Sequence, residues 1–415
     1  MSLRHIENIL ILLEYLLGVG IVTCEVVAHN SLTSTLFYLT FFITAALWVC
    51  TLLEEVKLVD VLTLLAIVIA LTNVLINAAL CRSIISFDYL KKLLMYSCTL
   101  LYLDSATKIH VKDRTIGIVA SLCVLANIVM TIAYQQQYTA MHLIDGQVSA
   151  YLTFRFTNPN LTALFLSCMI MILVLRASQV RQPLAKLIYY GTAAMQLNYL
   201  AETRCRNAML AIVIFFAVCL VMLIFNRRTA RIPKWVFAIS SVFPMLFASA
   251  YIVLINNPLF NEALAFMVGE GKGLSSRVLV WGDAVEGFWE SPILGAYAQV
   301  SGGTGMSQLH NTHLDVLASY GILVLALTCV LLYIYMTDAW ENGSLETRTI
   351  ALTGFLSTLM LGVGEAALFS GGLAIYLFMG FFLLYATQEQ RLEEEPRMRR
   401  RRFQLSRRLS RGGDV

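Results

Sequence analysis

Four short polar stretches carry the side chains of this sequence that are best suited to chemistry. They are set in a chain of 415 residues that is 58% hydrophobic and only 13% charged. Charge at membrane depth is costly and is usually kept for pairing or function. The stretches are Arg155–Asn160, Glu202–Asn207, Ser275–Trp281 and His310–Asp315.

Arginines in these stretches suit the binding of an anion such as phosphate, because a guanidinium stays charged and presents a planar fork of donors. Arg204 and Arg206 share a short predicted turn, where snorkelling to the interface or pairing with Glu202 is the alternative for either one. Arg277 begins a predicted amphipathic helix over Val278–Trp289, whose N-terminal N–H groups would also favour an anion. The alternative for Arg277 is an ordinary first-turn arginine in an interfacial helix.

His310 is a candidate general base, because an imidazole can accept a proton near neutral pH. A structural histidine is the alternative. His310 and His313 are also spaced as a metal pair, although two ligands alone are weak evidence. Asp315 fits either the orientation of an imidazole or the cap of a helix. Glu365, flanked by glycines, fits either a cavity lining or a salt bridge to an outer arginine.

Long apolar segments must position these side chains. Most of the runs are 17 to 23 residues long, as a hydrocarbon core roughly 30 Å thick requires of a helix. The sequence therefore predicts an all-α polytopic membrane protein of about twelve transmembrane helices. An interfacial helix is the alternative for the segment with Lys91 and Lys92. The expected spans are 8–28, 32–53, 59–80, 87–103, 116–134, 159–176, 185–200, 207–226, 235–255, 314–336, 348–367 and 371–387.

The positions of Lys and Arg predict the orientation, because cytoplasmic loops retain these residues. Of the 30 Lys and Arg residues, 22 fall on the side that holds both termini, which is therefore expected to be cytoplasmic. All four polar stretches then lie on the extracytoplasmic side, where they can converge. The first apolar stretch is expected to be a retained span and not a cleaved signal peptide.

Two segments depart from the pattern of spans. Residues 256–313 are expected to form an extracytoplasmic loop with turns and short helices, inside a transmembrane domain over 1–387. The basic tail over 388–415 is expected in the cytoplasm, bound to anionic membrane lipid and not to nucleic acid. The nine cysteines lack a C-x-x-C pair, so neither a disulfide framework nor a zinc site is expected.

The motifs within residues 201–325 resemble the O-antigen ligase and O-antigen (capsular polysaccharide) polymerase superfamily of bacterial membrane glycosyltransferases. An arginine opens a span after a short outer loop, and Asn158-Pro159-Asn160 is similar to a motif of polymerase-like members. The other matching features are Arg277-x-x-x-Trp281, Pro292-Ile-Leu-Gly295, His310-Asn311-x-x-Leu314 and Gly321.

Two positions depart from the family pattern. The family's Ser-Arg-Gly is Cys205-Arg206-Asn207 here, so Arg206 is the better match and Arg204 is a neighbour without an assigned role. Gly295 is followed by Ala296 and Tyr297, so the Gly-x-Gly after the proline is incomplete. Neither change removes a charged group.

The resemblance implies a metal-independent, inverting glycosyltransferase of the bacterial cytoplasmic (inner) membrane that needs no cofactor. Similar proteins move a glycan from a polyprenyl-diphosphate carrier to a hydroxyl of a glycan, lipid or wall-polymer acceptor. By this resemblance Arg206 and Arg277 hold the leaving diphosphate and His310 activates the hydroxyl. The residues expected to contact substrate are Arg155, Arg204, Asn311 and Glu365.

Other functions fit part of the pattern. The Asn158-Pro159-Asn160 motif favours a polymerase over a ligase by association only. A secondary transporter or flippase of lipid-linked sugars would show repeated halves and charged groups near the bilayer midplane. A non-catalytic scaffold is the third alternative, and it gives no reason for the set of arginines and histidine.

Overall fold

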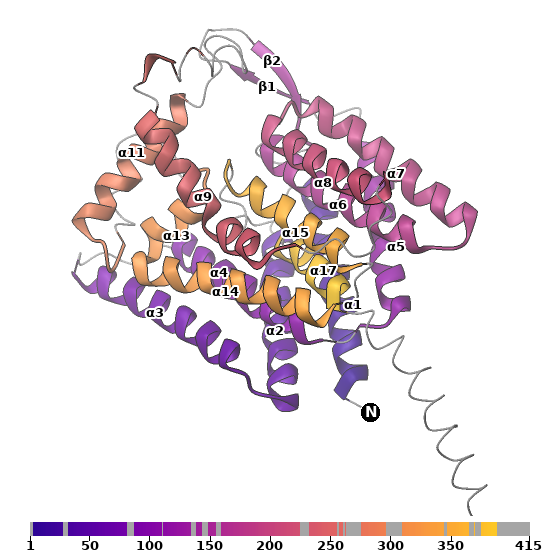
Figure 1. Cartoon of the computed structure of the whole chain (residues 1–415), viewed down its shortest axis with the longest axis horizontal. Coiled ribbons are helices and arrows are strands. Elements are labelled where there is room, and N and C mark those ends of the chain that lie inside the picture. Colours follow the sequence, from indigo (N-terminus) through magenta and orange to yellow (C-terminus); the bar gives the residue numbers. More distant parts are fainter. Residues whose placement is uncertain are drawn as a thin grey trace, which may run out of the picture.

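The computed structural model describes residues 3–27, 32–80, 87–109, 111–133, 138–142, 148–154, 159–224, 232–254, 257–259, 262, 275–295, 309–343, 347–364, 369 and 375–387. Most of these residues are helical, which confirms the predicted fold class (Figure 1). The helices are α1 (Leu3–Val27), α2 (Leu32–Glu54), α3 (Leu58–Leu80), α4 (Phe87–Lys108), α5 (Asp113–Ala133), α6 (Pro159–Gln179), α7 (Pro183–Glu202), α8 (Arg206–Ile224), α9 (Lys234–Leu254), α11 (Ser275–Glu290), α13 (Thr312–Tyr320), α14 (Ile322–Asn342), α15 (Arg348–Leu361) and α17 (Ile375–Thr387).

Seven of the described helices are long and apolar enough to cross a membrane, namely α1, α2, α3, α5, α6, α9 and α14. Three further apolar helices, α8, α15 and α17, are shorter. The lengths and composition of these helices are those of a polytopic membrane protein. The total of twelve spans and the cytoplasmic placement of the termini stay predictions.

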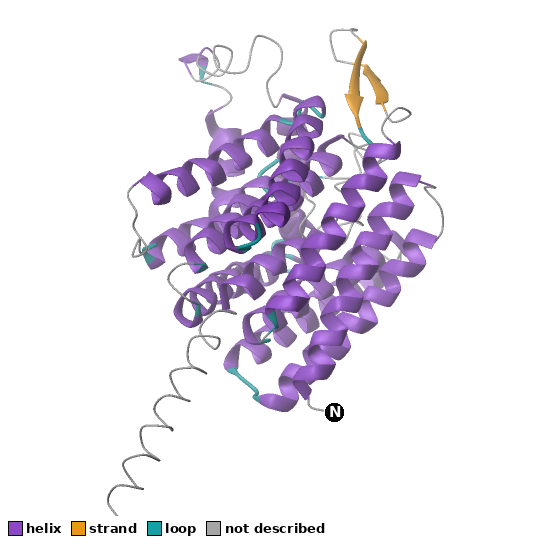
Figure 2. Ribbon diagram, turned by 90° about the vertical axis from the view of Figure 1, so that its right-hand side faces the viewer, coloured by secondary structure: helices purple, strands orange, loops and turns teal. Residues whose placement is uncertain are grey.

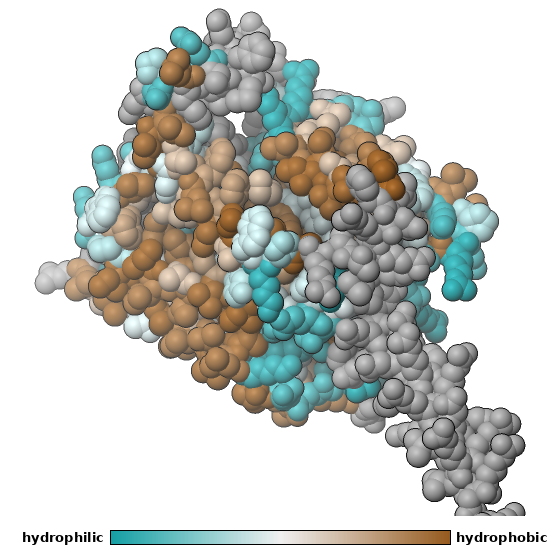
Figure 3. All heavy atoms as spheres, viewed as in Figure 1, coloured by the Kyte–Doolittle hydropathy of each residue, from teal (hydrophilic) through white to brown (hydrophobic). Residues whose placement is uncertain are grey.

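The surface has the apolar character that lipid contact requires. Figure 3 shows hydrophobic residues over the face formed by α3 and α14. Large exposed side chains on α3 include Val61, Leu64, Val68, Leu71 and Leu75. In water such a continuous patch would favour aggregation, whereas hydrocarbon solvates it without cost.

The helix α4 is buried inside the bundle. Every residue from Met95 to Thr107 is buried, and α4 packs against α2, α3, α14 and α17. This burial favours a position within the bundle over the interfacial alternative, and the membrane crossing of this segment stays a prediction. Helix α4 is less hydrophobic than the other helices because it carries polar groups that are paired within the protein. Asp104, for example, accepts a hydrogen bond from Trp48 Nε1 at 2.7 Å and forms an ion pair with Lys108 at 2.9 Å.

A small β-hairpin interrupts the all-helical pattern. The strands β1 (Tyr138–His142) and β2 (Val148–Leu152) pair antiparallel, with Ala140 opposite Ala150. The hairpin projects beyond the helices at the end of the molecule opposite the N-terminus (Figure 2). The hairpin is not predictable from the sequence, because five-residue strands leave too short a pattern to detect.

The expected tenth span, 314–336, is two helices and not one. The chain turns at Gly321, which has a φ of +82° and separates α13 from α14. Such a φ strains any residue with a Cβ, so glycine permits the break. Each of the other expected spans overlaps a single described helix.

Candidate functional site

Three consecutive carbonyls at the C-terminal end of α15 bring two of the predicted motifs together. Asparagine side chains supply two of the hydrogen bonds, and a main-chain N–H supplies the third. The bonds run from Asn207 Nδ2 to Leu361 O at 2.9 Å, from Thr312 N to Gly362 O at 2.9 Å, and from Asn311 Nδ2 to Val363 O at 3.2 Å. Arg206 directly precedes Asn207, and His310 directly precedes Asn311, so the backbones of Arg206 and His310 both lie near the end of α15.

The third motif is joined to the same region by a tryptophan. Trp281 is fully buried in α11, and its Nε1 donates to Leu309 O at 2.7 Å, directly before His310. Its ring also packs edge-on against Tyr251 of α9, with centroids 5.8 Å apart. Arg277 lies one helical turn before Trp281 in α11. The hydrogen bond from Trp281 to Leu309 O therefore holds the helix of Arg277 against the segment that carries His310.

Asn311 is the structural centre of the His310 motif. It is fully buried and caps α13, because its Oδ1 accepts from the main-chain N–H groups of His313 and Leu314 at 3.0 Å each. Its Nδ2 donates to Pro244 O at 2.9 Å as well as to Val363 O. The side chain thus uses both of its ends within the protein, and its role as a substrate contact stays a prediction.

His310 has an unusual backbone conformation for a residue other than glycine. Its φ is +50°, and its side chain is partly exposed between two fixed neighbours, Leu309 and Asn311. Histidine occupies this left-handed region more readily than most residues, but the conformation still costs of order 1–3 kcal/mol. Strain of this size persists where the surrounding contacts impose it, as Trp281 and Asn311 do here.

His313 and Asp315 have partners other than those expected from the sequence. The His313 ring is buried, with Nε2 2.6 Å from Ser241 O of α9. Asp315 is 3.4 Å from Lys92 Nζ of α4 and does not cap α13, which is the role of Asn311. These two side chains fix α13 on its neighbours. No cluster of three or more potential metal ligands occurs in the part of the chain that the structure describes.

The Pro292-Ile-Leu-Gly295 motif packs against the break at Gly321. A Cβ on Gly321 would lie 1.9 Å from Ile293 O, and one on Gly295, whose φ is +81°, would lie 2.7 Å from Ala318 O. Ile322 N donates to Pro292 O at 2.9 Å. Both glycines are therefore required by close backbone contact, and the motif is a structural brace for α13.

Two asparagines of α3 complete this brace and were missed in the sequence. Asn73 Nδ2 donates to Ile293 O at 3.0 Å and to Tyr320 O at 2.7 Å. Asn77 Nδ2 donates to Leu294 O at 2.9 Å and to Gly295 O at 3.1 Å. The available signal was a pair of amides four residues apart on one face of an otherwise apolar span.

The other predicted site residues are placed as follows. Arg204, with a φ of +54°, is exposed and its guanidinium lies 5.5 Å from the Tyr151 ring of β2, so it meets the hairpin. Arg206 is exposed at the first turn of α8. The side chain of Arg277 lies outside the described part of the chain, as do Arg155, Asn158, Glu365 and the tail over 388–415. Within the loop over 256–313, residues 256, 260–261, 263–274 and 296–308 also lie outside it.

The region that holds these motifs is similar to a known protein family. Residues 191–329 match the family model described as O-antigen ligase. The matched segment contains the motifs of Arg206, Arg277 and His310, and it confirms the resemblance found in the sequence. No curated protein matches the chain.

Proposed function

We propose that this protein transfers a glycan from a polyprenyl-diphosphate carrier to an acceptor hydroxyl. The match of residues 191–329 to the family model described as O-antigen ligase supports a glycosyltransferase of the O-antigen ligase and polymerase superfamily. The reaction takes place on the outer face of the cytoplasmic membrane. The observation that carries the proposal is the shared anchorage of three motifs: Asn207 and Asn311 on the end of α15, and Trp281 on Leu309.

Arg206 and Arg277 stabilise the leaving group in this proposal. When the glycosyl–oxygen bond breaks, negative charge develops on the diphosphate, and fixed guanidiniums placed there lower the barrier without reorganisation. The exposed Arg206 at the first turn of α8 is available to such a ligand. The N-terminus of α11 adds main-chain N–H groups beside Arg277.

His310 is the general base of the proposed reaction. The acceptor hydroxyl oxygen forms a bond to the anomeric carbon, the bond from that carbon to the diphosphate oxygen breaks, and the hydroxyl proton passes to His310. One direct displacement inverts the anomeric configuration. The neighbours of His310 are held by hydrogen bonds, Leu309 by Trp281 and Asn311 by Val363 O. The backbone conformation that His310 adopts between them suits a base that must hold one orientation.

Polymerisation of glycan repeat units is the form of the reaction that we favour. The support is the motif Asn158-Pro159-Asn160, whose Pro159 begins α6. A ligase that uses a lipid or wall-polymer acceptor has the same chemistry and needs the same three groups. The two are separated by the products, since a polymerase gives a ladder of chain lengths and a ligase adds one preformed chain.

The direct test is reconstitution of the purified protein in liposomes with a lipid-linked glycan on the outer leaflet. A transferase releases polyprenyl diphosphate and yields a longer or ligated glycan, whereas a transporter moves the intact lipid across the bilayer without cleaving it. Accumulation of unpolymerised lipid-linked glycan in a deletion strain is the matching expectation in cells. Movement without cleavage would refute the proposal.

A further inference from the structure

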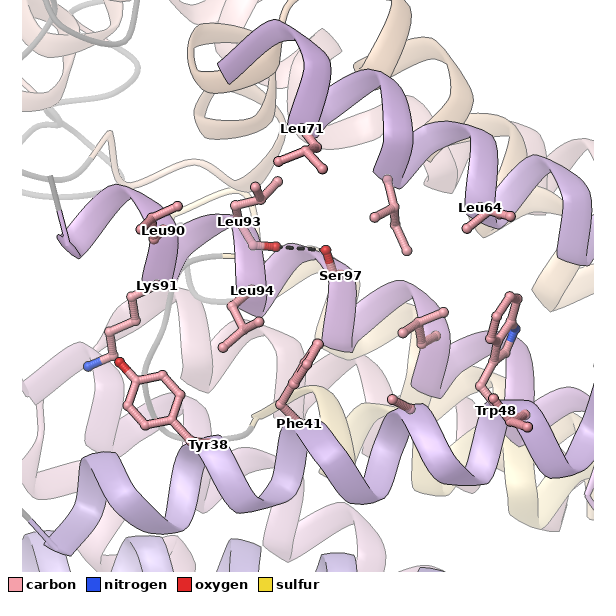
Figure 4. Close-up of a pocket in the computed structure, with 14 residues that line it drawn as sticks. Tyr38, Phe41, Trp48, Leu64, Leu71, Leu90, Lys91, Leu93, Leu94 and Ser97 are labelled. Atoms are coloured by element: carbon pink, nitrogen blue, oxygen red, sulfur yellow. Dashed lines mark hydrogen bonds between the residues drawn. The ribbon is translucent and has the colours of Figure 1, made fainter. Parts of the chain in front are cut away.

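An apolar groove lies between α2, α3 and α4. Its volume is about 560 Å³, within the range of roughly 300–1,000 Å³ that is usual for small-ligand sites. Figure 4 shows Lys91 and Tyr38 at one end and Trp48 at the other, with leucines between them. Leu64 and Leu71 on its wall are 48% and 42% exposed, so the groove opens toward the apolar surface of the bundle.

The groove is elongated along the helices. The residues that α4 contributes run from Leu90 through Leu94 to Leu101. With a rise of 1.5 Å per residue, this stripe is about 16 Å long. A narrow apolar channel of this length, parallel to membrane-spanning helices, fits a hydrocarbon chain and not a compact polar molecule.

Two polar side chains of the wall are already paired within the protein. Ser97 Oγ donates to Leu93 O at 2.9 Å, and Trp48 Nε1 donates to Asp104 Oδ2 at 2.7 Å. Neither group therefore requires a polar ligand. Among the described residues that line the groove, Lys91 alone carries a charge, and its Nζ lies 6.0 Å from the Phe37 ring centroid. The groove is thus a hydrocarbon channel with a cation at one end.

The cationic end of the groove is next to the candidate site. Lys92, which follows Lys91, reaches from α4 to Asp315 of α13 at a distance of 3.4 Å. Asp315 is one helical turn from Asn311, the cap that fixes His310. Because Lys91 and Lys92 are consecutive in α4, the end of the groove and the α13 helix of the His310 motif both lie at the first turns of α4.

We propose that this groove holds part of the polyprenyl chain of the donor, with Lys91 attracting the diphosphate that joins the chain to the glycan. The inference rests on the proposed function and adds the binding site of the lipid portion of the donor. A lipid of this class combines a long hydrocarbon chain with an anionic head, which is the combination that the groove and Lys91 complement.

Binding measurements on the full chain in detergent test the groove. The ligands are a long-chain polyprenyl diphosphate, inorganic diphosphate and phosphatidylglycerol. Leu94→Trp fills the groove and should weaken binding of the polyprenyl diphosphate at least tenfold, with binding of inorganic diphosphate unchanged. Leu75→Trp is the matched control, because Leu75 lies on α3 outside the groove and is 52% exposed. Equal long-chain affinities for the two variants would overturn the inference.

The charge of Lys91 has its own test. Lys91→Gln should lower affinity for the polyprenyl diphosphate several-fold, and Lys91→Arg should retain most of it. If phosphatidylglycerol displaces the polyprenyl diphosphate from the wild-type protein at equal concentration, the site is one for general anionic lipid and the proposed occupant is wrong.

A photoreactive polyprenyl diphosphate, with a diazirine on the chain, tests the wild-type protein without a substitution. Labelled peptides should come from α2, α3 and α4, and labelling confined to other helices would contradict the inference. Failure of the proposed function gives a different result: an intact groove labelled by the lipid, but no glycan transfer by the reconstituted wild-type protein.

Discussion

Asn207 and Asn311, which are 104 positions apart in the sequence, donate hydrogen bonds to carbonyls only two residues apart, those of Leu361 and Val363. The end of α15 thereby fixes the start of α8 and the start of α13 relative to each other. Because Arg206 and His310 directly precede the two asparagines, this contact brings the backbones of these two residues from distant parts of the chain to one region.

Loss of the Asn207 contact should misplace Arg206 without removing its charge. In Asn207→Ala, Leu361 O loses its side-chain donor, and we expect glycan transfer to fall at least tenfold while a positive charge remains at position 206. The measurement is the initial rate with purified protein and a lipid-linked donor. Asn198→Ala is the matched control, because Asn198 is exposed in α7 and bonds only locally, to Glu202. Equal rates for the two variants would show that the anchor is unimportant.

Trp281→Phe tests the connection between α11 and the His310 motif. The substitution keeps an aromatic ring in the buried site but removes the donor to Leu309 O, which leaves a buried carbonyl unpaired at a cost of about 1–3 kcal/mol. We expect a lower Tm and a reduced kcat with little change in acceptor KM. Trp289→Phe, at a position that is 73% exposed, should change neither value. A normal kcat in Trp281→Phe would argue against a positioning role.

Gly321→Ala should be among the most damaging small substitutions in the chain. Position 321 has a φ of +82°, and the added Cβ would lie 1.9 Å from Ile293 O. Backbone strain and displacement of the Pro292–Gly295 segment together should cost at least about 3 kcal/mol. The thermal midpoint in detergent measures the loss. Gly191→Ala is the control, because nothing lies within 4 Å of a Cβ there and alanine favours its helix.

The ion pair between Lys92 and Asp315 gives a prediction that a double substitution can verify. Lys92→Met leaves the Asp315 carboxylate, whose side chain is 7% exposed, without this cation. Removing one partner of a buried pair costs more than replacing both. The Tm of Lys92→Met should therefore lie below that of the double variant Lys92→Met with Asp315→Asn. A double variant that is the less stable of the two would rule out the pair as a link between α4 and α13.

The positions of the helices could be predicted well because the length of an apolar run limits where a membrane helix can lie. The expected span 235–255 compares with α9 at Lys234–Leu254, and 159–176 compares with α6 at Pro159–Gln179. The motifs around Arg206, Trp281 and His310 were also visible, since polar residues stand out in an apolar chain. These features depend on residues close together in the sequence.

Features that depend on tertiary contact could not be predicted. The break at Gly321 requires the approach of Ile293, and the burial of α4 depends on polar partners supplied by other helices. Asn73 looked like one more polar residue in a span, but its role is set by carbonyls 220 and 247 residues away along the chain. Asp315 was assigned to a cap or an imidazole because Lys92 was not known to be near.

The most direct test of the central claim is the rate of polyprenyl diphosphate release, in the presence of acceptor, by Arg206→Ala, Arg277→Ala and His310→Ala proteins that fold normally. Each should fall by about 10²–10³-fold, the usual effect of removing one charge-stabilising group or a general base, while Arg181→Ala on the expected cytoplasmic side keeps the wild-type rate. Near wild-type release by any one of the three would contradict a single site built from Arg206, Arg277 and His310.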